Sequence, residues 1–196
     1  MDKKAFIDTV RRAQKSAQPL PEYSEADTTS TTATAGDVLA AFERNFAANH
    51  GIVVKSAEEL AAKLKELGCK RGVADAKLGD TFGLESEFDL SYDFDRSNPD
   101  GYDFGISRAT NAIAENGVLV LKDCDTADRM ATIAPWVHVA VLDKNAVLKT
   151  ITDGLKDVLE NTPYTIWVAG PSKTTDVEGV LVEGVHGPGK QICFLV

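Results

Sequence analysis

Hydrophobic positions along this chain follow two alternating spacings, one typical of amphipathic helices and one typical of strands. Helical spacing predicts helices over residues 2–17, 37–49, 57–67, 108–114 and 145–159. Short apolar runs predict strands over residues 52–54, 70–75, 88–94, 104–107, 118–121, 136–142, 164–169 and 191–196. Because strands and helices alternate, the pattern predicts a layered α/β fold with a mainly parallel sheet.

Local signals mark several helix ends. Asp37 is placed to cap the helix that follows it, and Ser56 with Glu59 forms a capping box that opens the next one. Gly68 is expected to close that second helix. His138 lies alone inside a predicted strand, where a histidine is expected to be packed or to face solvent.

Residues 1–36 have a different character from the rest of the chain. A short amphipathic helix is followed by Pro19, Pro21 and a polar, Thr-rich segment. We therefore divide the chain into an arm of residues 1–36 and a domain of residues 37–196. The helix could cap the domain or pack on a partner chain in a homo-oligomer, and the sequence leaves both open.

The chain is acidic, with a formal net charge of −9 and a pI near 4.8. Lys and Arg are outnumbered, so nucleic acid or an anionic membrane is not an expected partner. Most of the excess comes from nine acidic residues: 75, 80, 85, 87, 89, 93, 95, 100 and 103. A calcium loop that began at Asp93 would need Gly and Glu where Asn98 and Phe104 stand, so we expect a solvated acidic turn and no metal.

The three cysteines are Cys69, Cys124 and Cys193, far apart and without a paired motif. This usage predicts reduced thiols in a cytoplasmic protein. It also excludes an iron–sulfur cluster held by this chain alone, since such clusters usually need four thiolates. No signal-peptide pattern and no apolar run of membrane-spanning length appear.

The segment of residues 164–188 carries the clearest candidate chemistry. Its apolar strand runs into Gly170-Pro171, then into Ser172, Lys173 and Thr174, with Asp176 and Glu178 expected to open a helical turn. A second glycine elbow follows, with Gly184, His186 and Gly187. A strand that feeds a glycine turn and a helix start favours an anion at its backbone N–H groups. The alternative is a tight connection that needs small residues only for geometry.

These residues also carry a resemblance. The segments 170–178 and 183–188 resemble the closing signature of the LUD domain family, known as lactate utilisation protein C. A third match is Ile113-Ala114-Glu115-Asn116-Gly117-Val118-Leu119-Val120-Leu121, close to the family's I-A-E-T-G-T-L-V-L. The resemblance implies the three-layer α/β/α architecture of the glucosamine-6-phosphate isomerase, ribose-5-phosphate isomerase and CoA-transferase superfamily.

Glu115-Asn116-Gly117 is similar to the Ser-Glu-Asn-Gly of some CoA transferases, in which the Glu accepts an acyl group. The resemblance therefore makes Glu115 a candidate acyl acceptor. At the expected site, Glu115 and His186 are candidates for proton transfer or polar recognition. Where family members often have small residues ending in Asp, residues 107–111 read Ser-Arg-Ala-Thr-Asn, and this departure leaves the ligand's identity open. We expect Glu115–Gly117, Gly170–Thr174 and His186-Gly187 to converge on a small anionic ligand at the sheet edge.

The resemblance implies a role in oxidising L-lactate to pyruvate as a subunit of an iron–sulfur-dependent complex. The partners would be iron–sulfur lactate-utilisation proteins, which hold the clusters, while this chain binds no cofactor of its own. A second hypothesis is a stand-alone binding protein or transferase for a small acid, a sugar phosphate or a CoA-linked ligand. A third is a structural subunit that only holds its partners. Whether the chain is catalytic by itself is left open.

Overall fold

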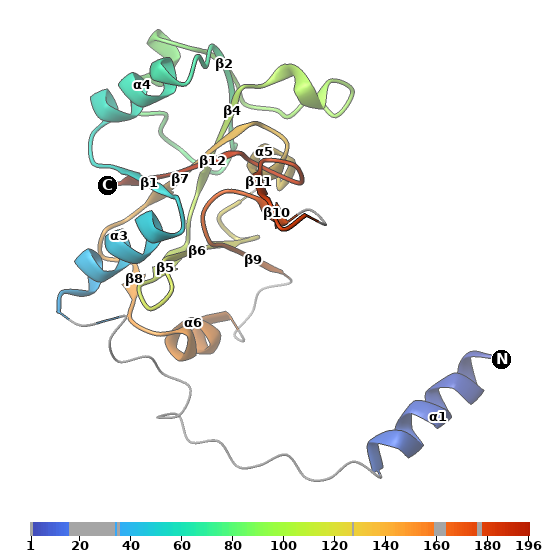
Figure 1. Ribbon diagram of the computed structural model, residues 1–196. Coiled ribbons are helices and arrows are strands. Elements are labelled where there is room, and N and C mark those ends of the chain that lie inside the picture. The colour runs from blue at the N-terminus through green and yellow to red at the C-terminus, as the bar shows by residue number, and fades with distance from the viewer. Residues whose placement is uncertain (1, 16–33, 35, 127, 159–163, 176–177) are drawn as a thin grey trace.

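A parallel sheet of six strands forms the centre of the fold (Figure 1). The computed structural model describes residues 2–15, 34, 36–126, 128–158, 164–175 and 178–196. The strand order is β1-β12-β7-β4-β2-β3, and every neighbouring pair in it is parallel. The strands are β1 (Ile52–Val54), β2 (Arg71–Ala74), β3 (Asp89–Ser91), β4 (Phe104–Arg108), β7 (Val137–Leu142) and β12 (Lys190–Leu195). The predicted mainly parallel sheet is confirmed.

Helices cover both faces of this sheet, which gives the three expected layers. On one face α4 (Ala57–Glu66) buries Leu60 and Leu64 against β4, β7 and β12. On the other face α3 (Val38–Ala48) buries Phe42 and Phe46. The short α5 (Met130–Ile133) packs on the same face of the sheet as α3. It lies so close to β4 that a Cβ on Gly105 would overlap a backbone carbonyl of α5.

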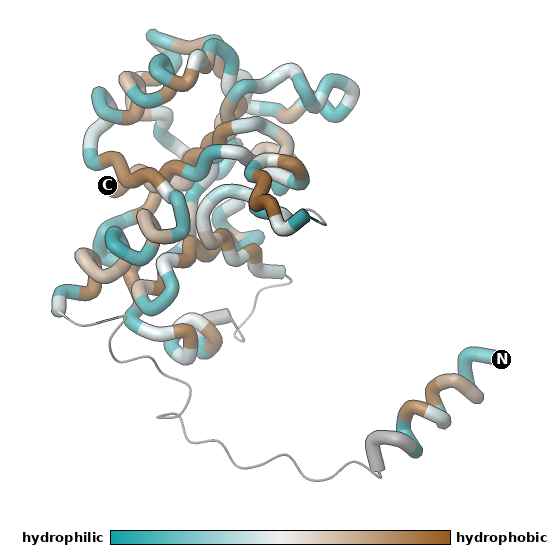
Figure 2. Tube along the Cα trace, in the orientation of Figure 1, coloured by the Kyte–Doolittle hydropathy of each residue, from teal (hydrophilic) through white to brown (hydrophobic). Residues whose placement is uncertain are grey.

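The middle strands are apolar because both of their faces are covered. All six residues of β7 are buried, as are residues 191–195 of β12, and Figure 2 shows the hydrophobic run of β12 reaching the C-terminus beside β1. Continuous apolar runs of this kind are typical of parallel strands between two helical layers. The packing of these strands therefore determines the position of everything attached to their ends.

A second sheet lies on the α3 face. Its order is β8-β5-β6-β9, with antiparallel pairing except between β5 and β8. Its strands are β5 (Asn111–Ile113), β6 (Val118–Lys122), β8 (Val147–Leu148) and β9 (Thr165–Val168). α6 (Ile151–Val158) follows β8, and β10 (Lys173–Thr175) and β11 (Leu181–Glu183) form a separate hairpin. Leu119 and Leu121 of β6 join the core under α3.

The local helix signals act as predicted. Asp37 caps α3 by accepting the N–H of Ala40 at 2.8 Å. Ser56 caps α4 by accepting the N–H of Glu59, and Gly68 follows that helix with φ of +77°. Two short 3₁₀ helices, Leu84–Ser86 and Pro99–Gly101, interrupt the acidic region, and the residues of the second are not buried.

Two predicted helices are wrong in part. Residues 111–113, expected within a helix, form β5, because β6 and β8 pair with them on both sides. Arg108, expected to begin that helix, ends β4 instead. The helix predicted over 145–159 begins only at Ile151, since Val147 and Leu148 form β8 and pair with β5.

The amino-terminal helix α1 (Lys3–Lys15) forms where the spacing predicts it and stands apart from the sheet in Figure 1. Phe6 and Val10 are exposed on it. The rest of the predicted arm, except for Thr34 and Gly36, lies outside the described residues. The division of the chain at residue 36 stays a prediction.

A buried polar chain crosses the three middle strands. His138 of β7 lies between Ser107 of β4 and Gln191 of β12, with 2.8 Å from Nε2 to Ser107 Oγ and 2.9 Å from Nδ1 to Gln191 Oε1. An amide oxygen can only accept, so Nδ1 carries the proton and Nε2 accepts from the hydroxyl. Burial lowers the pKa of His138 to about 4, so the ring stays neutral near pH 7. Of the two placements expected for this histidine, packed or facing solvent, the structure shows the packed one.

Candidate functional site

The motif segments meet at the carboxyl end of α3, and we call this region the α3 corner. It comprises Asn45, Asn49, residues 114–117 and residues 170–173. Gly117 has φ of +60°, and a Cβ there would overlap the backbone of Asn45 and Phe46. Gly170 has φ of +76°, and a Cβ there would overlap the carbonyl oxygen of Asn49. The two glycines thus let two distant turns pack against one helix end.

Several side chains at the α3 corner donate hydrogen bonds to backbone carbonyls. Asn45 Nδ2 donates to the carbonyl of Ala114 at 2.7 Å, and Asn49 Nδ2 donates to the carbonyl of Asn116 at 2.8 Å. Lys173 Nζ donates to the carbonyl of Asn49 at 2.5 Å. These bonds satisfy carbonyls that a turn and a helix end leave without partners. They explain much of the motif as structural support.

Glu115 also has a structural contact. Its Oε2 accepts the N–H of Ile151 at 2.9 Å, where α6 begins. A carboxylate in this position stabilises the first turn of a helix. The neighbouring Asn116 Oδ1 is buried and accepts no hydrogen bond within the described residues. A catalytic role for Glu115 stays a prediction.

Residues 173–175 after Gly170-Pro171 form a strand, and the helical turn expected at 176–178 lies mostly outside the described residues. Lys173 begins β10, which pairs with β11. The N–H of Ser172 donates to the carbonyl of Pro188 at 2.8 Å, and the carbonyl of Ser172 accepts the N–H of Gly184 at 2.9 Å. The strands β10 and β11 therefore form a hairpin here, and an anion site at these N–H groups stays a prediction. Thr174 is half-buried within β10 and Glu178 is exposed, while Asp176 lies outside the described residues.

His186 follows β11 at the open end of this hairpin, where the N–H of Ser172 donates to the carbonyl of Pro188. It lines a cavity of about 520 Å³ together with Gly184, Gly187, Trp136 and Asp103, and Glu115 is not among the described lining residues. The three predicted segments are therefore brought together only in part. Gly117 and Gly170 share the α3 corner, and a Cβ added to Gly187 would lie 3.3 Å from the side chain of Ser172.

A nearby ion pair joins the hairpin to α3. His50, which follows α3, lies 2.6 Å from Glu183 of β11 through Nδ1 and Oε1. The hydrogen bond from His50 lowers the pKa of the Glu183 carboxyl. The pair links the hairpin to the end of α3. Because it is exposed, it should add little to the stability of the fold.

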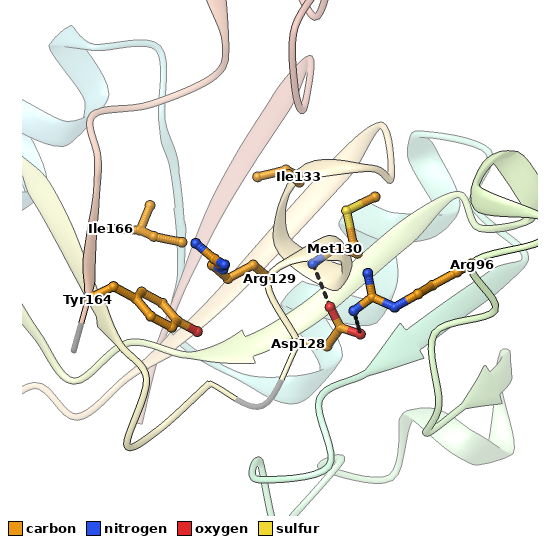
Figure 3. A pocket seen from close by; sticks show the side chains of 7 residues that line it. All are labelled: Arg96, Asp128, Arg129, Met130, Ile133, Tyr164 and Ile166. Atoms are coloured by element: carbon orange, nitrogen blue, oxygen red, sulfur yellow. Dashed lines mark hydrogen bonds and ion pairs between the residues drawn. The ribbon is translucent and has the colours of Figure 1, made fainter. Parts of the chain in front are cut away.

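A second cavity of about 520 Å³ has no counterpart in the sequence prediction, and we call it the Arg129 cavity (Figure 3). Its lining residues come from three separate stretches: Arg96, Asp128, Arg129, Met130, Ile133, Tyr164 and Ile166. The guanidinium carbon of Arg129 lies 4.4 Å from the centroid of the Tyr164 ring. Figure 3 shows this stack on one side of the cavity and the Arg96–Asp128 pair on the other.

The acidic groups beside this cavity are already engaged. Asp128 accepts from Arg96 at 2.9 Å and from the N–H of Met130 at 2.8 Å. Asp75, buried where β2 ends, accepts the N–H groups of Asp128 and Lys77. β2 has β3 on one side and β4 on the other, and parallel sheets bind ligands at the carboxyl ends of strands where the strand order reverses. The cavity lies beside that point of the sheet.

No sequence motif points to the Arg129 cavity. Arg129 precedes a four-residue helix, and Tyr164 precedes β9, so their contact depends on packing between segments 35 residues apart. The one available signal was an arginine that follows three acidic residues, at 123, 125 and 128. That pattern by itself favours only a charged surface turn.

The described residues hold no metal site and no membrane-spanning helix. No group of three or more His, Cys, Asp or Glu side chains is arranged to hold a metal ion. Within the same part of the chain, no helix is both long and apolar enough to cross a membrane.

Comparison with a solved structure bears on the fold. A crystal structure of a DUF162 family protein from Deinococcus radiodurans superposes with a TM-score of 0.61 at 23% sequence identity. The superposition covers 81% of this chain and 96% of that one. The shared architecture therefore extends well beyond the motif segments.

Comparison with curated sequences bears on the family. Lactate utilization protein C of Deinococcus radiodurans is 37% identical over 82 residues, which cover 39% of this chain and 38% of that protein. Lactate utilization protein C of Bacillus subtilis is 30% identical over 99 residues, 47% of this chain and 41% of that protein. The matched segment thus spans about two fifths of these relatives' length. The LUD domain matches residues 92–196, more than half of the chain. The chain belongs to the LUD domain family.

Proposed function

We propose that this protein serves L-lactate utilisation, as a subunit that contributes to the oxidation of lactate to pyruvate. The observation that carries the proposal is the 37% identity with lactate utilization protein C of Deinococcus radiodurans. The LUD domain match over residues 92–196 supports it. The matched relatives are longer than the shared segment, so the role of the whole protein is inferred from this domain.

The electrons of lactate oxidation would pass to partner proteins. Cys69 and Cys193 are buried, and burial raises the pKa of both thiols, to about 11 at Cys69. Only Cys124 is exposed among the three cysteines of the sequence. Because a cluster usually needs four thiolates, we propose that iron–sulfur partner proteins hold the redox centres. This chain would bind the acid or hold the complex together.

Growth of the host tests the proposal. Deleting the gene should abolish growth on L-lactate as sole carbon source, and a plasmid copy should restore it, while growth on glucose stays unchanged. A tagged chain recovered from lactate-grown cells should bring iron and acid-labile sulfide with it. A deletion strain that grows normally on L-lactate would contradict the proposed role.

A second candidate function is a stand-alone small-acid binding protein. The Arg129 cavity favours it, since an arginine faces a space with apolar walls. Recovery of the tagged chain separates the two, because a stand-alone protein would be recovered without iron.

A further inference from the structure

We propose that the Arg129 cavity binds a small monocarboxylate, with the carboxylate paired to the Arg129 guanidinium and the alkyl part against Ile133 and Ile166. The proposal deepens the proposed function, since L-lactate is such an acid, and rests on it only for the choice of ligand. The site itself is argued from the geometry of its side chains.

The first step is the state of the two arginines that line the cavity. Arg96 is paired with Asp128 at 2.9 Å. Arg129 makes no ion pair with any residue that the structure describes, although it stands beside three acidic positions in the sequence. Figure 3 shows the Asp128 carboxylate directed toward Arg96 and the N–H of Met130, on the far side from the Arg129–Tyr164 stack. One cationic group thus remains for a ligand.

The second step is the orientation of that group. Arg129 lies over the Tyr164 ring at 4.4 Å, which holds one flat face of the guanidinium. Stacking of this kind leaves the N–H groups at the edge of the guanidinium directed into the cavity. A carboxylate matches two of these donors at once, which a point charge such as lysine could not reproduce.

The third step is the character of the remaining walls. Met130, Ile133 and Ile166 supply apolar surface, and Ile133 is 46% exposed toward solvent. A single uncompensated cation with apolar walls suits an anion that carries one charge and a short alkyl group. A phosphate dianion would keep one charge without a partner in this setting. Tyr164 lines the same cavity, and burial raises the pKa of its hydroxyl.

A matched site in the same molecule serves as the control. Arg71 lies over the Tyr102 ring at 5.1 Å, the same kind of stack. However, Arg71 pairs with Asp89 at 3.6 Å and is not among the residues that line the Arg129 cavity. If stacking alone made a carboxylate site, both arginines would bind. The geometry predicts that only Arg129 does.

The experiment is an NMR titration of the ¹⁵N-labelled full chain with L-lactate and pyruvate. L-lactamide, which keeps the shape without the charge, and inorganic phosphate serve as comparison ligands. Both carboxylates should shift the backbone signals of residues 128–133 and 164–166. Lactamide and phosphate should bind at least about tenfold more weakly, as expected for loss of a charge-assisted pair.

Three variants make the assignment specific. Arg129→Gln should weaken lactate binding about 10- to 100-fold, Arg129→Lys should restore only part of it, and Arg71→Gln should change it less than twofold. Thermal unfolding of each variant shows whether it is folded. If Arg129→Lys and Arg129→Gln both bind lactate like the parent chain, the site is wrong. Equal binding of phosphate, or no carboxylate binding at all, would also overturn it.

Failure here is distinguishable from failure of the proposed function. If the deletion strain loses growth on L-lactate but the purified chain binds no carboxylate, the lactate role stands and this cavity is not its site. If the chain binds monocarboxylates through Arg129 but the deletion strain grows on L-lactate, the site stands and its acid belongs to another pathway.

Discussion

The α3 corner and the Arg129 cavity use their polar groups in opposite ways. At the α3 corner, Asn45, Asn49 and Lys173 bind backbone carbonyls, and Glu115 accepts the first N–H of α6. In the Arg129 cavity, a guanidinium stacks on a ring and has no acidic partner among the described residues. The segments with a recognisable signature are thus largely committed to the fold, while a cation without any signature remains available to a ligand.

The difference follows from what each region needs. Two turns that pack on one helix end require glycine and amide side chains at fixed positions, so the requirement appears in the sequence as a motif. A binding cavity requires one charge and some apolar surface, which many residues at many positions could supply. A strong signature therefore indicates demanding geometry, and its meaning for function has to be tested separately.

The largest expected effect is that of Gly117→Ala. The methyl group would meet the backbone of α3, and the residue would keep a left-handed conformation, so we expect a loss of at least about 3 kcal/mol. Gly68→Ala is the control, since Gly68 also has positive φ but has nothing within 4 Å of the added methyl. That control should lose only about 1 kcal/mol in urea unfolding. Similar losses in both variants would mean that the α3 corner can shift to accommodate the methyl group. Close packing would then not be the reason for glycine at position 117.

The next largest effect is the pH dependence of stability that His138 causes. In the folded chain burial lowers its pKa from 6.5 to about 4, so the unfolded chain binds the proton more readily between these values. The free energy of unfolding should therefore fall as the pH drops from about 6.5 to 4. His138 alone should account for a total loss of about 3 kcal/mol.

Urea unfolding at several pH values measures this slope. His138→Gln should lower stability at pH 7 but remove this part of the pH dependence, because glutamine does not titrate. His186→Asn, a substitution at an exposed histidine, serves as the comparison variant. An unchanged slope in the His138 variant would show that another group causes the acid sensitivity.

The strands and caps were largely predictable because their causes are local. Asp37 and Ser56 bond to N–H groups within three residues, and the apolar runs of β7 and β12 record burial on both faces. The error at residues 111–113 has a nonlocal cause: β6 and β8 decide their conformation. The same reason hid the cavity, since Arg129 and Tyr164 meet only in the folded chain.

Arg129→Gln sharpens the comparison further. The exposed stack on Tyr164 is worth about 0.5–1 kcal/mol, so the variant should remain folded with only a small shift in its unfolding midpoint. If the Arg129 cavity serves lactate utilisation, the same variant should fail to restore growth of the deletion strain on L-lactate. Arg71→Gln, from the paired stack over Tyr102, should restore growth. Growth with Arg129→Gln would remove the cavity from the lactate role.

The smallest expected effect on stability is that of Glu115→Gln. Glutamine keeps an oxygen that can accept the N–H of Ile151, so only the favourable charge at the start of α6 is lost, about 0.5 kcal/mol. Glu115→Ala removes the acceptor as well and should cost about 1 kcal/mol, which urea unfolding can resolve. If Glu115 is only a helix cap, Gln restores growth on L-lactate and Ala does so nearly as well. If the Gln variant is folded and still fails to restore growth, the carboxylate itself is required. The α3 corner would then be a catalytic site as well as a support, and its contrast with the Arg129 cavity would no longer hold.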